Sequence, residues 1–499
     1  MSPVPSVSTE ASVPSQSSGS PGSSGSPGSP ASSAAAGPAA SSAVPARRRT
    51  AWAEGLDHLR GAATTEPGRL RALGAVLALL VVVFGAATAW QVTDRSAAAD
   101  DVVLRSQPLT VDAASIFRSL ADADTTAAGG FLAGGTESAA TRQRYEADVA
   151  TASQLLVRAA ANARVPGAED GAADRTGEQV ARLNALLPRY TGLIETARTN
   201  NRQGLPLGGA YLRYANGLMR TELLPAAQAL YEAETQRLAV DQARATAWPG
   251  FALVAGVVAL GALGWAQRRH YRRTNRVFNR GLLVATVASV AVLLWLAVGH
   301  AVARAGLVDA YEHGTRSLQA LNTARIDALR ARADENLTLV ARGAVLTADQ
   351  KDFYEVDFQS KMGHLAGPGG PGPVVAAGEL GKALALVDDE AGRRPVLDAV
   401  AAAGQWRARH AAARAADDRG AYDRALAQVI GGSGSTGASF DRVDTGLGRA
   451  LVHEQARFRA TADGGRAAFR LLAVGGAVLA VLAATAAVWG VGRRLSEYR

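Results

Sequence analysis

Four long apolar stretches divide the chain, and segments of mixed polar and apolar residues lie between them. The apolar stretches are residues 72–90, 246–266, 281–303 and 469–492. About 20 apolar residues in a helix suffice to cross the hydrocarbon core of a bilayer. The pattern therefore predicts an all-α membrane protein with four transmembrane helices.

Residues 91–245 and 304–468 connect these spans in pairs and are expected to form two helical bundles outside the cytoplasm. Their apolar residues recur at helical spacing, and no run of alternating β-branched residues indicates a sheet. Glycine and proline clusters mark the expected ends of helices, beginning with the glycine pair at 129–130. We expect four helices in the first bundle, the last of which starts at Tyr211 and continues through the second span to Ala266.

The loop 267–280, between the second and third spans, carries six arginines and one histidine but no acidic residue. Basic residues in short loops stay in the cytoplasm, because moving their charge across a bilayer is costly. The loop therefore predicts that both ends of the chain, including residues 493–499, are cytoplasmic. It is either a contact for a cytoplasmic partner or a purely topological anchor, and its candidate contact residues are Arg268, Arg269, Arg272, Arg273 and Arg276.

The first 71 residues are rich in Ser, Pro, Gly and Ala and end in a basic segment. A chain of this composition cannot bury enough apolar surface to offset the entropy of ordering. We expect a disordered cytoplasmic tail. The span that follows is either an uncleaved anchor or part of a cleaved signal peptide, and the long leader favours the anchor.

The two halves of the chain resemble copies of one unit. The motif Tyr-Glu-x-Asp occurs at residues 145–148 and again at 354–357, an offset of 209. The motif Gly-Ala-Tyr-x-Arg occurs at 209–213 and at 420–424, an offset of 211, and the first spans of the two halves also start 209 residues apart. Agreeing offsets predict an internal duplication in which the two copies have the same orientation in the membrane.

The Tyr-Glu-x-Asp motif is a candidate contact site in each half, and its residues are Tyr145, Glu146, Asp148, Tyr354, Glu355 and Asp357. On a helix, the tyrosine and the aspartate of each motif share one face. The motif is either a ligand or partner contact or a structural element in which the tyrosine packs against a neighbouring helix. Duplicated positions mostly preserve a core, which favours the structural interpretation.

The net charge of +9 does not indicate nucleic-acid binding, because the excess lies beside the membrane. Residues 91–245 contain 16 basic and 18 acidic side chains, and residues 304–468 contain 21 of each. The sequence has no cysteine, no HExxH motif, and no nucleotide-binding or nucleophile-elbow motif. It therefore predicts a protein that is not an enzyme and that needs no metal or cofactor.

The layout resembles the helical-bundle sensor domains of bacterial chemoreceptors and sensor kinases, in which both ends of the bundle continue into membrane spans. Two such units in tandem, together with residues 131–156 (FLAGGTESAATRQRYEADVATASQLL), are similar to the GlnX family of actinobacterial membrane proteins. This resemblance implies an external partner, an amino-acid-binding lipoprotein specific for aspartate and glutamate. It also implies a cytoplasmic partner, the soluble Ser/Thr kinase called protein kinase G.

Layout and resemblance together predict a non-enzymatic signal relay in the plasma membrane, with the N- and C-termini inside. Two other functions stay open: a scaffolding protein of the cell envelope that senses nothing, and an accessory subunit of a transporter. Small residues along one face of the last span suit close packing of helices, either within one chain or in a homodimer.

Overall fold

The computed structural model describes residues 66–134, 137–163, 170–274, 280–369 and 376–496. Apart from an isolated bridge between Leu346 and Asp352, the regular structure in these residues is helical, which confirms the predicted all-α class. The expected disordered tail lies outside the described residues up to position 65. The helix ends predicted within 164–169 and 370–375 also lie outside them.

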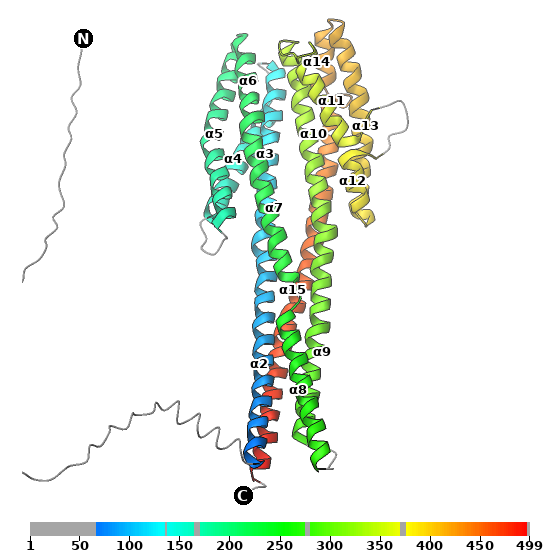
Figure 1. The fold of residues 1–499 in the computed structure, drawn as a ribbon. Coiled ribbons are helices and arrows are strands. Elements are labelled where there is room, and N and C mark those ends of the chain that lie inside the picture. The colour runs from blue at the N-terminus through cyan, green and yellow to red at the C-terminus, as the bar shows by residue number, and fades with distance from the viewer. Residues whose placement is uncertain (1–65, 135–136, 164–169, 275–279, 370–375, 497–499) are drawn as a thin grey trace, which may run out of the picture. The chain divides into compact units, whose positions relative to one another are not determined.

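The first half begins with three helical segments that follow one another without a break (Figure 1). They are α2 (Glu66–Asp101), the π-helical segment η1 (Val102–Ser106) and α3 (Gln107–Leu132). The expected helix end at Gly129-Gly130 is wrong, because both glycines lie inside α3. Gly130 is buried there and Gly129 lies against Asn336 of the second half, so tertiary packing outweighs the low helix propensity of glycine.

The rest of the first half packs around α3 and comprises α4 (Ala139–Ala163), α5 (Asp170–Arg202), α6 (Leu207–Leu218), the π-helical segment η3 (Met219–Leu223) and α7 (Leu224–Thr246). Helix α3 contacts α4 and α7, and α5 contacts α4, α6 and α7. Pro225 directly follows η3 inside one unbroken helical run, and its missing N–H leaves one hydrogen bond of that run unmade beside the π-helical segment.

A break separates α7 from the following apolar helix α8 (Gly250–Thr274). Ala247 has an extended backbone with a ψ of 138°, and Pro249 precedes the first residue of α8. Proline cannot donate a backbone hydrogen bond and disfavours the helical conformation in the residue before it. The expectation of one continuous helix from Tyr211 to Ala266 is therefore wrong at residues 247–249.

The second half begins with α9 (Arg280–Asp309), the π-helical segment η4 (Ala310–Thr315) and α10 (Arg316–Ala341), again without a break. Its other helices are α11 (Phe353–Ala366), α12 (Gly378–Leu386), α13 (Glu390–Asp418), α14 (Tyr422–Ile430) and α15 (Thr436–Ser496). Helix α10 contacts α11, α12 and α15, and α13 lies along α15. The segments η1 and η4 begin 208 positions apart, close to the offset of the sequence motifs. The duplication itself stays a prediction.

Three helical stretches are long and apolar enough to cross a membrane, and they lie within Ala72–Leu132, Leu207–Arg269 and Gly281–Asp309. They contain the first three predicted spans. The fourth predicted span, 469–492, belongs to α15, where most side chains lie outside the described part of the chain, and it stays a prediction. Helix α15 contacts α9 and α2, while α8 contacts α2 and α9.

A single hydrophobic core serves both halves. It contains Phe117 and Leu120 of α3 together with Leu321 and Leu329 of α10. The two helices are also joined by polar contacts: the Thr125 hydroxyl donates to the Leu329 carbonyl at 2.9 Å, and Arg118 donates to Asn322 at 2.9 Å. The segments expected as two external bundles therefore pack together through α3 and α10.

Candidate ligand cavity between the two halves

A cavity of about 130 Å³ lies where α3, α6 and η3 of the first half meet α10 and α11 of the second half. Six of its lining side chains are charged, and three of these belong to an arginine or a lysine. The lining residues are Ala121, Asp124, Asn216, Arg220, Leu224, Arg330, Ala333, Asp334, Asp357 and Lys361.

Arg220 joins the two halves at this cavity. Its Nη1 donates to Asp334 Oδ1 at 2.5 Å, and its Nη2 donates to Asp357 Oδ2 at 2.7 Å. The guanidinium also lies 4.9 Å from the centre of the Phe353 ring. Arg220 belongs to the π-helical segment η3, and π-helical turns inside α-helices are frequent at functional sites.

The two aspartates that bind Arg220 differ in protonation. Burial raises the pKa of Asp334 well above its usual value, and the charge of Arg220 only partly offsets this. Burial also acts on Asp357, but the nearby Arg220 outweighs it and lowers the pKa of Asp357. Arg220 contacts both carboxyl groups, and their pKa values move in opposite directions, so we assign the proton to Asp334 and the negative charge to Asp357.

Asp124 forms the wall of the cavity on the α3 side. Its Oδ1 accepts a hydrogen bond from the Tyr190 hydroxyl at 3.1 Å, and its Oδ2 accepts one from the Asn216 amide at 2.6 Å. Burial raises the pKa of Asp124 to about 6, although both hydrogen bonds favour the charged form. The charge of Asp124 is therefore sensitive to pH around 6.

Arg330 and Lys361 are the cations of the cavity that make no close ion pair in the described residues, although Asp327 lies near both. In the part of the chain that the structure describes, neither makes a hydrogen bond or an ion pair within 4.0 Å. Arg330 lies over the Phe117 ring at 5.3 Å, and burial lowers its pKa, an effect that the nearby Asp327 carboxylate only partly offsets. The lining has three basic and three acidic side chains, and the raised pKa of Asp334 favours the neutral form of that carboxyl group.

The Tyr-Glu-x-Asp motif of the second half lies at the cavity, but its three residues do not form a single site. Asp357 lines the cavity. Tyr354 is buried beside it, with its ring edge-on to Phe353 at 5.3 Å. Glu355 points elsewhere and pairs with His410 and Arg414 of α13, at 3.0 and 3.4 Å.

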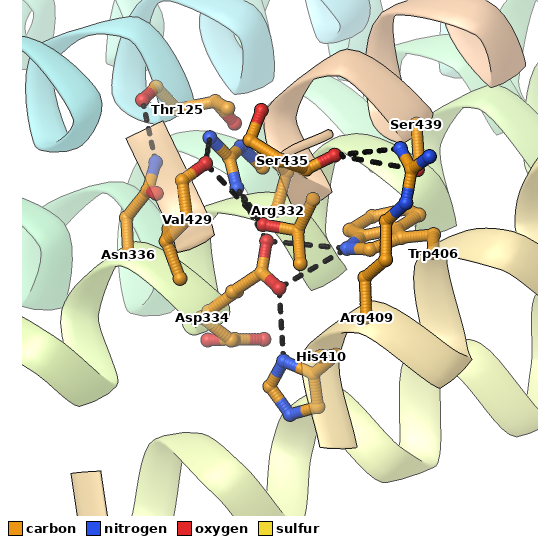
Figure 2. A network of polar contacts seen from close by, with 12 residues as sticks. Thr125, Arg332, Asp334, Asn336, Trp406, Arg409, His410, Val429, Ser435 and Ser439 are labelled. Atoms are coloured by element: carbon orange, nitrogen blue, oxygen red, sulfur yellow. Dashed lines mark hydrogen bonds and ion pairs between the residues drawn. The ribbon is translucent and has the colours of Figure 1, made fainter. Parts of the chain in front are cut away.

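His410 belongs to a buried polar network next to the cavity (Figure 2). Its Nδ1 lies 2.9 Å from Glu335 Oε1 and its Nε2 lies 3.0 Å from Glu355 Oε2. The Glu335 carboxylate also pairs with Arg332 and accepts from the Trp406 indole at 3.1 Å. Burial alone would lower the pKa of His410, but the two glutamates outweigh it and raise the pKa to about 9.

The first-half motif lies outside the cavity. Tyr145 is buried under the Arg198 guanidinium, 4.2 Å from its ring centre, and its hydroxyl has no hydrogen-bond partner among the described residues. Glu146 is exposed and pairs with Arg142 at 2.9 Å. Asp148 lies beside Asp122, and burial together with the charge of Asp122 raises its pKa to about 8.

The candidate cytoplasmic arginines are only partly described. Arg268, Arg269 and Arg272 are exposed on α8, and Arg269 lies over the Trp265 ring at 5.2 Å. Arg273 belongs to α8 as well, but its side chain is not described, and Arg276 lies outside the described residues.

One group of side chains in the described residues has the spacing of a metal site, namely Asp389, His453 and Glu454. Arg457 lies 3.6 Å from Asp389 and 3.8 Å from Glu454, and the His453 ring is 2.8 Å from Asp389. Asp389 also accepts the Gly392 N–H at the start of α13. The arginine supplies the positive charge that a metal would bring, so this group is an ion-pair cluster.

Sequence patterns indicate the cavity residues only weakly. Asp124 and Asp334 each lie in alanine-rich helical segments, where an acid on a buried face is a weak signal. Helix α10 is buried on several sides, because α3, α11, α12 and α15 all pack on it. Such a helix has no polar stripe against which a buried aspartate could be recognised.

Fold and helix composition together define an all-helical membrane protein. Within it, residues 98–243, from the end of α2 through most of α7, match the family described as the actinobacterial sensor domain. This match supports a sensing role in a protein of actinobacterial type. No curated protein and no solved structure matches the chain.

Proposed function

We propose that this protein is a non-enzymatic transmembrane sensor that relays an external signal to the cytoplasm. The observation that carries the proposal is the continuity of two helical rods. Segments α2–η1–α3 and α9–η4–α10 each run unbroken from an apolar stretch to the shared core, where α3 and α10 touch. A displacement of α3 against α10 in the core is thereby carried to the apolar ends.

The π-helical segments give these rods a place to adjust. A π-helical turn is closed by i→i+5 hydrogen bonds, and such turns inside α-helices are frequent at functional sites. In η1, Ser106 donates to Asp241 of α7, and in η4, Gly314 lies against Phe458 of α15. Both segments therefore contact the helix that closes their own half.

The return helices of the two halves differ. The break at residues 247–249 separates α7 from α8, whereas α15 is continuous from Thr436 to Ser496. We infer that the first half transmits a displacement mainly through α2, and the second half through both α9 and α15. A coupling free energy of about 1–3 kcal/mol suffices to bias a partner.

The proposed orientation places four spans in the plasma membrane, with both termini and residues 267–280 inside. The external partner would be a solute-binding lipoprotein loaded with aspartate or glutamate, and the cytoplasmic partner a Ser/Thr kinase. The family match to a sensor domain supports the sensing role, and the exposed Arg268, Arg269 and Arg272 support a contact at the basic loop.

Because the sequence has no cysteine, two spin labels can be placed at will. We would label Ala72→Cys on α2 and Leu283→Cys on α9 in nanodiscs and add a solute-binding lipoprotein with its amino acid. The proposal expects the label distance to change by roughly 1–2 Å or its distribution to narrow. A control pair on α4, Ala140→Cys and Val157→Cys, keeps its distance. A bound lipoprotein that leaves the first pair unchanged contradicts the relay.

A further inference from the structure

We propose that the cavity between the halves binds a small oxyanion, a carboxylate or a phosphate, between Arg330 and Lys361 of the second half and Arg220 of the first. This inference rests on the proposed sensor function, for which it supplies a ligand class. The cavity draws its charged residues from both halves, so an occupant would contact both at once.

The size of the cavity limits the occupant. An apolar cavity of about 150 Å³ in another protein holds benzene, which has six non-hydrogen atoms. A cavity of about 130 Å³ therefore suits roughly five to eight non-hydrogen atoms, because part of it opens to solvent. Inorganic phosphate and succinate fall within this range, acetate is slightly smaller, and a nucleotide is too large.

The charges favour an anion over a cation. Arg220 is neutralised by Asp357, and Asp124 already accepts two hydrogen bonds. Arg330 and Lys361 make no hydrogen bond or ion pair within 4.0 Å among the described residues, although the Asp327 carboxylate lies near both. An oxyanion between them accepts hydrogen bonds from both, whereas a cation placed there would be repelled by both side chains.

Binding would also act on the contact between the halves. Arg220 of η3 and Arg330 of α10 belong to opposite halves and are close enough to repel each other. An anion between them removes this repulsion and holds η3 against α10. The ligand would thereby strengthen the contact between the two halves, through which a movement of α3 is passed to α10.

The test uses the full chain in detergent and measures binding by calorimetry and thermal unfolding. The probes are phosphate, acetate and succinate. Chloride at equal ionic strength is the control for salt effects, and methylammonium tests whether a cation binds instead. We expect one oxyanion to bind with a stoichiometry of one and to raise Tm. The identity of the oxyanion that binds decides between phosphate and carboxylate. Binding by none of the three, or stabilisation by methylammonium alone, overturns the inference.

Variants locate the site. Lys361→Met and Arg330→Met should each weaken binding at least tenfold, and Arg330→Lys should restore part of it. Lys382→Met is the matched control, because Lys382 is exposed on α12 and pairs with Glu379. Lys361 is half-buried and makes no ion pair in the described residues, so Lys361→Met should fold, as circular dichroism would verify. Unchanged affinity in folded Lys361→Met contradicts the proposed site.

The two proposals fail separately. If no oxyanion binds but the α2–α9 label distance still responds to the lipoprotein, the relay stands and the ligand assignment falls. If an oxyanion binds and the label distance never responds to any addition, the cavity is a ligand site without a relay.

Discussion

Gly306 of α9 and Gly465 of α15 lie against each other with no side chain between them. A Cβ atom built on Gly306 would be 3.3 Å from the Gly465 Cα, and one built on Gly465 would be 3.2 Å from the Leu307 nitrogen. The two helices cross at this point because neither residue has a Cβ. The crossing lies immediately after the third predicted span.

A leucine at position 465 should force α9 and α15 apart. We expect Gly465→Leu to lower the free energy of unfolding by about 1–3 kcal/mol, the usual cost of overpacking. The control is Gly464→Leu, because a Cβ at Gly464 meets nothing within 4 Å. Thermal or denaturant unfolding in detergent measures both, and equal stability of the two variants would show that the close crossing is unimportant.

Removing the guanidinium of Arg220 should weaken the contact between the halves. Arg220→Met leaves Asp357 without its cation, and loss of one partner of a buried pair costs about 3–5 kcal/mol. Arg220 is about a quarter exposed, so we expect about 2–4 kcal/mol. Arg182→Met is the control, because Arg182 is half exposed and lies 3.8 Å from Glu222. A loss below about 1 kcal/mol in the Arg220 variant would contradict the prediction.

The His410 network predicts a pH dependence of stability. The folded pKa of His410 is raised to about 9, so its stabilising contribution is full below about 6.5 and is lost as the pH rises to 9. We expect His410→Gln to remove this part of the slope. Unfolding free energies between pH 6 and 9.5 measure the difference from the unchanged protein, and His364→Gln, an exposed position, is the control. Parallel curves for the unchanged protein and His410→Gln would refute the assignment.

Asp148 should be destabilising when it ionises. Its folded pKa is raised to about 8, so its protonated form is favoured by the fold and stability falls as pH rises from about 4 to 8. Asp148→Asn should be more stable than the unchanged protein at pH 8 by about 1–2 kcal/mol, after allowance for partial exposure. The advantage should shrink toward pH 5. The exposed Glu146→Gln should show no such trend.

The orientation in the membrane predicts which cysteines a membrane-impermeant thiol reagent can reach. Val157→Cys, on exposed α4, should react from outside intact cells, and Arg272→Cys should react only after the cells are opened. The unchanged protein is a blank, because it has no cysteine. Reaction of Arg272→Cys in intact cells would show that the topology is the reverse of the proposed one, and the proposed direction of the relay would then be wrong.

The amino-acid sequence by itself determined the helical class and the positions of the first three apolar helices. Both depend on local patterns, namely long apolar runs and apolar residues at helical spacing. Local rules also erred where packing outweighed them. The glycine pair at 129–130 continues α3 because Gly130 is buried and Gly129 lies against Asn336, and the chain breaks before Pro249, which the apolar pattern concealed.

Only the tertiary structure decided that both halves share one core and that a charged cavity lies between them. Arg220 meets Asp334 and Asp357 across sequence separations of 114 and 137 residues. No local pattern encodes such a meeting, because it depends on which faces of α3 and α10 pack together. For the same reason the Tyr-Glu-x-Asp motif, identical in both halves, places Asp357 in the cavity and leaves Asp148 beside Asp122.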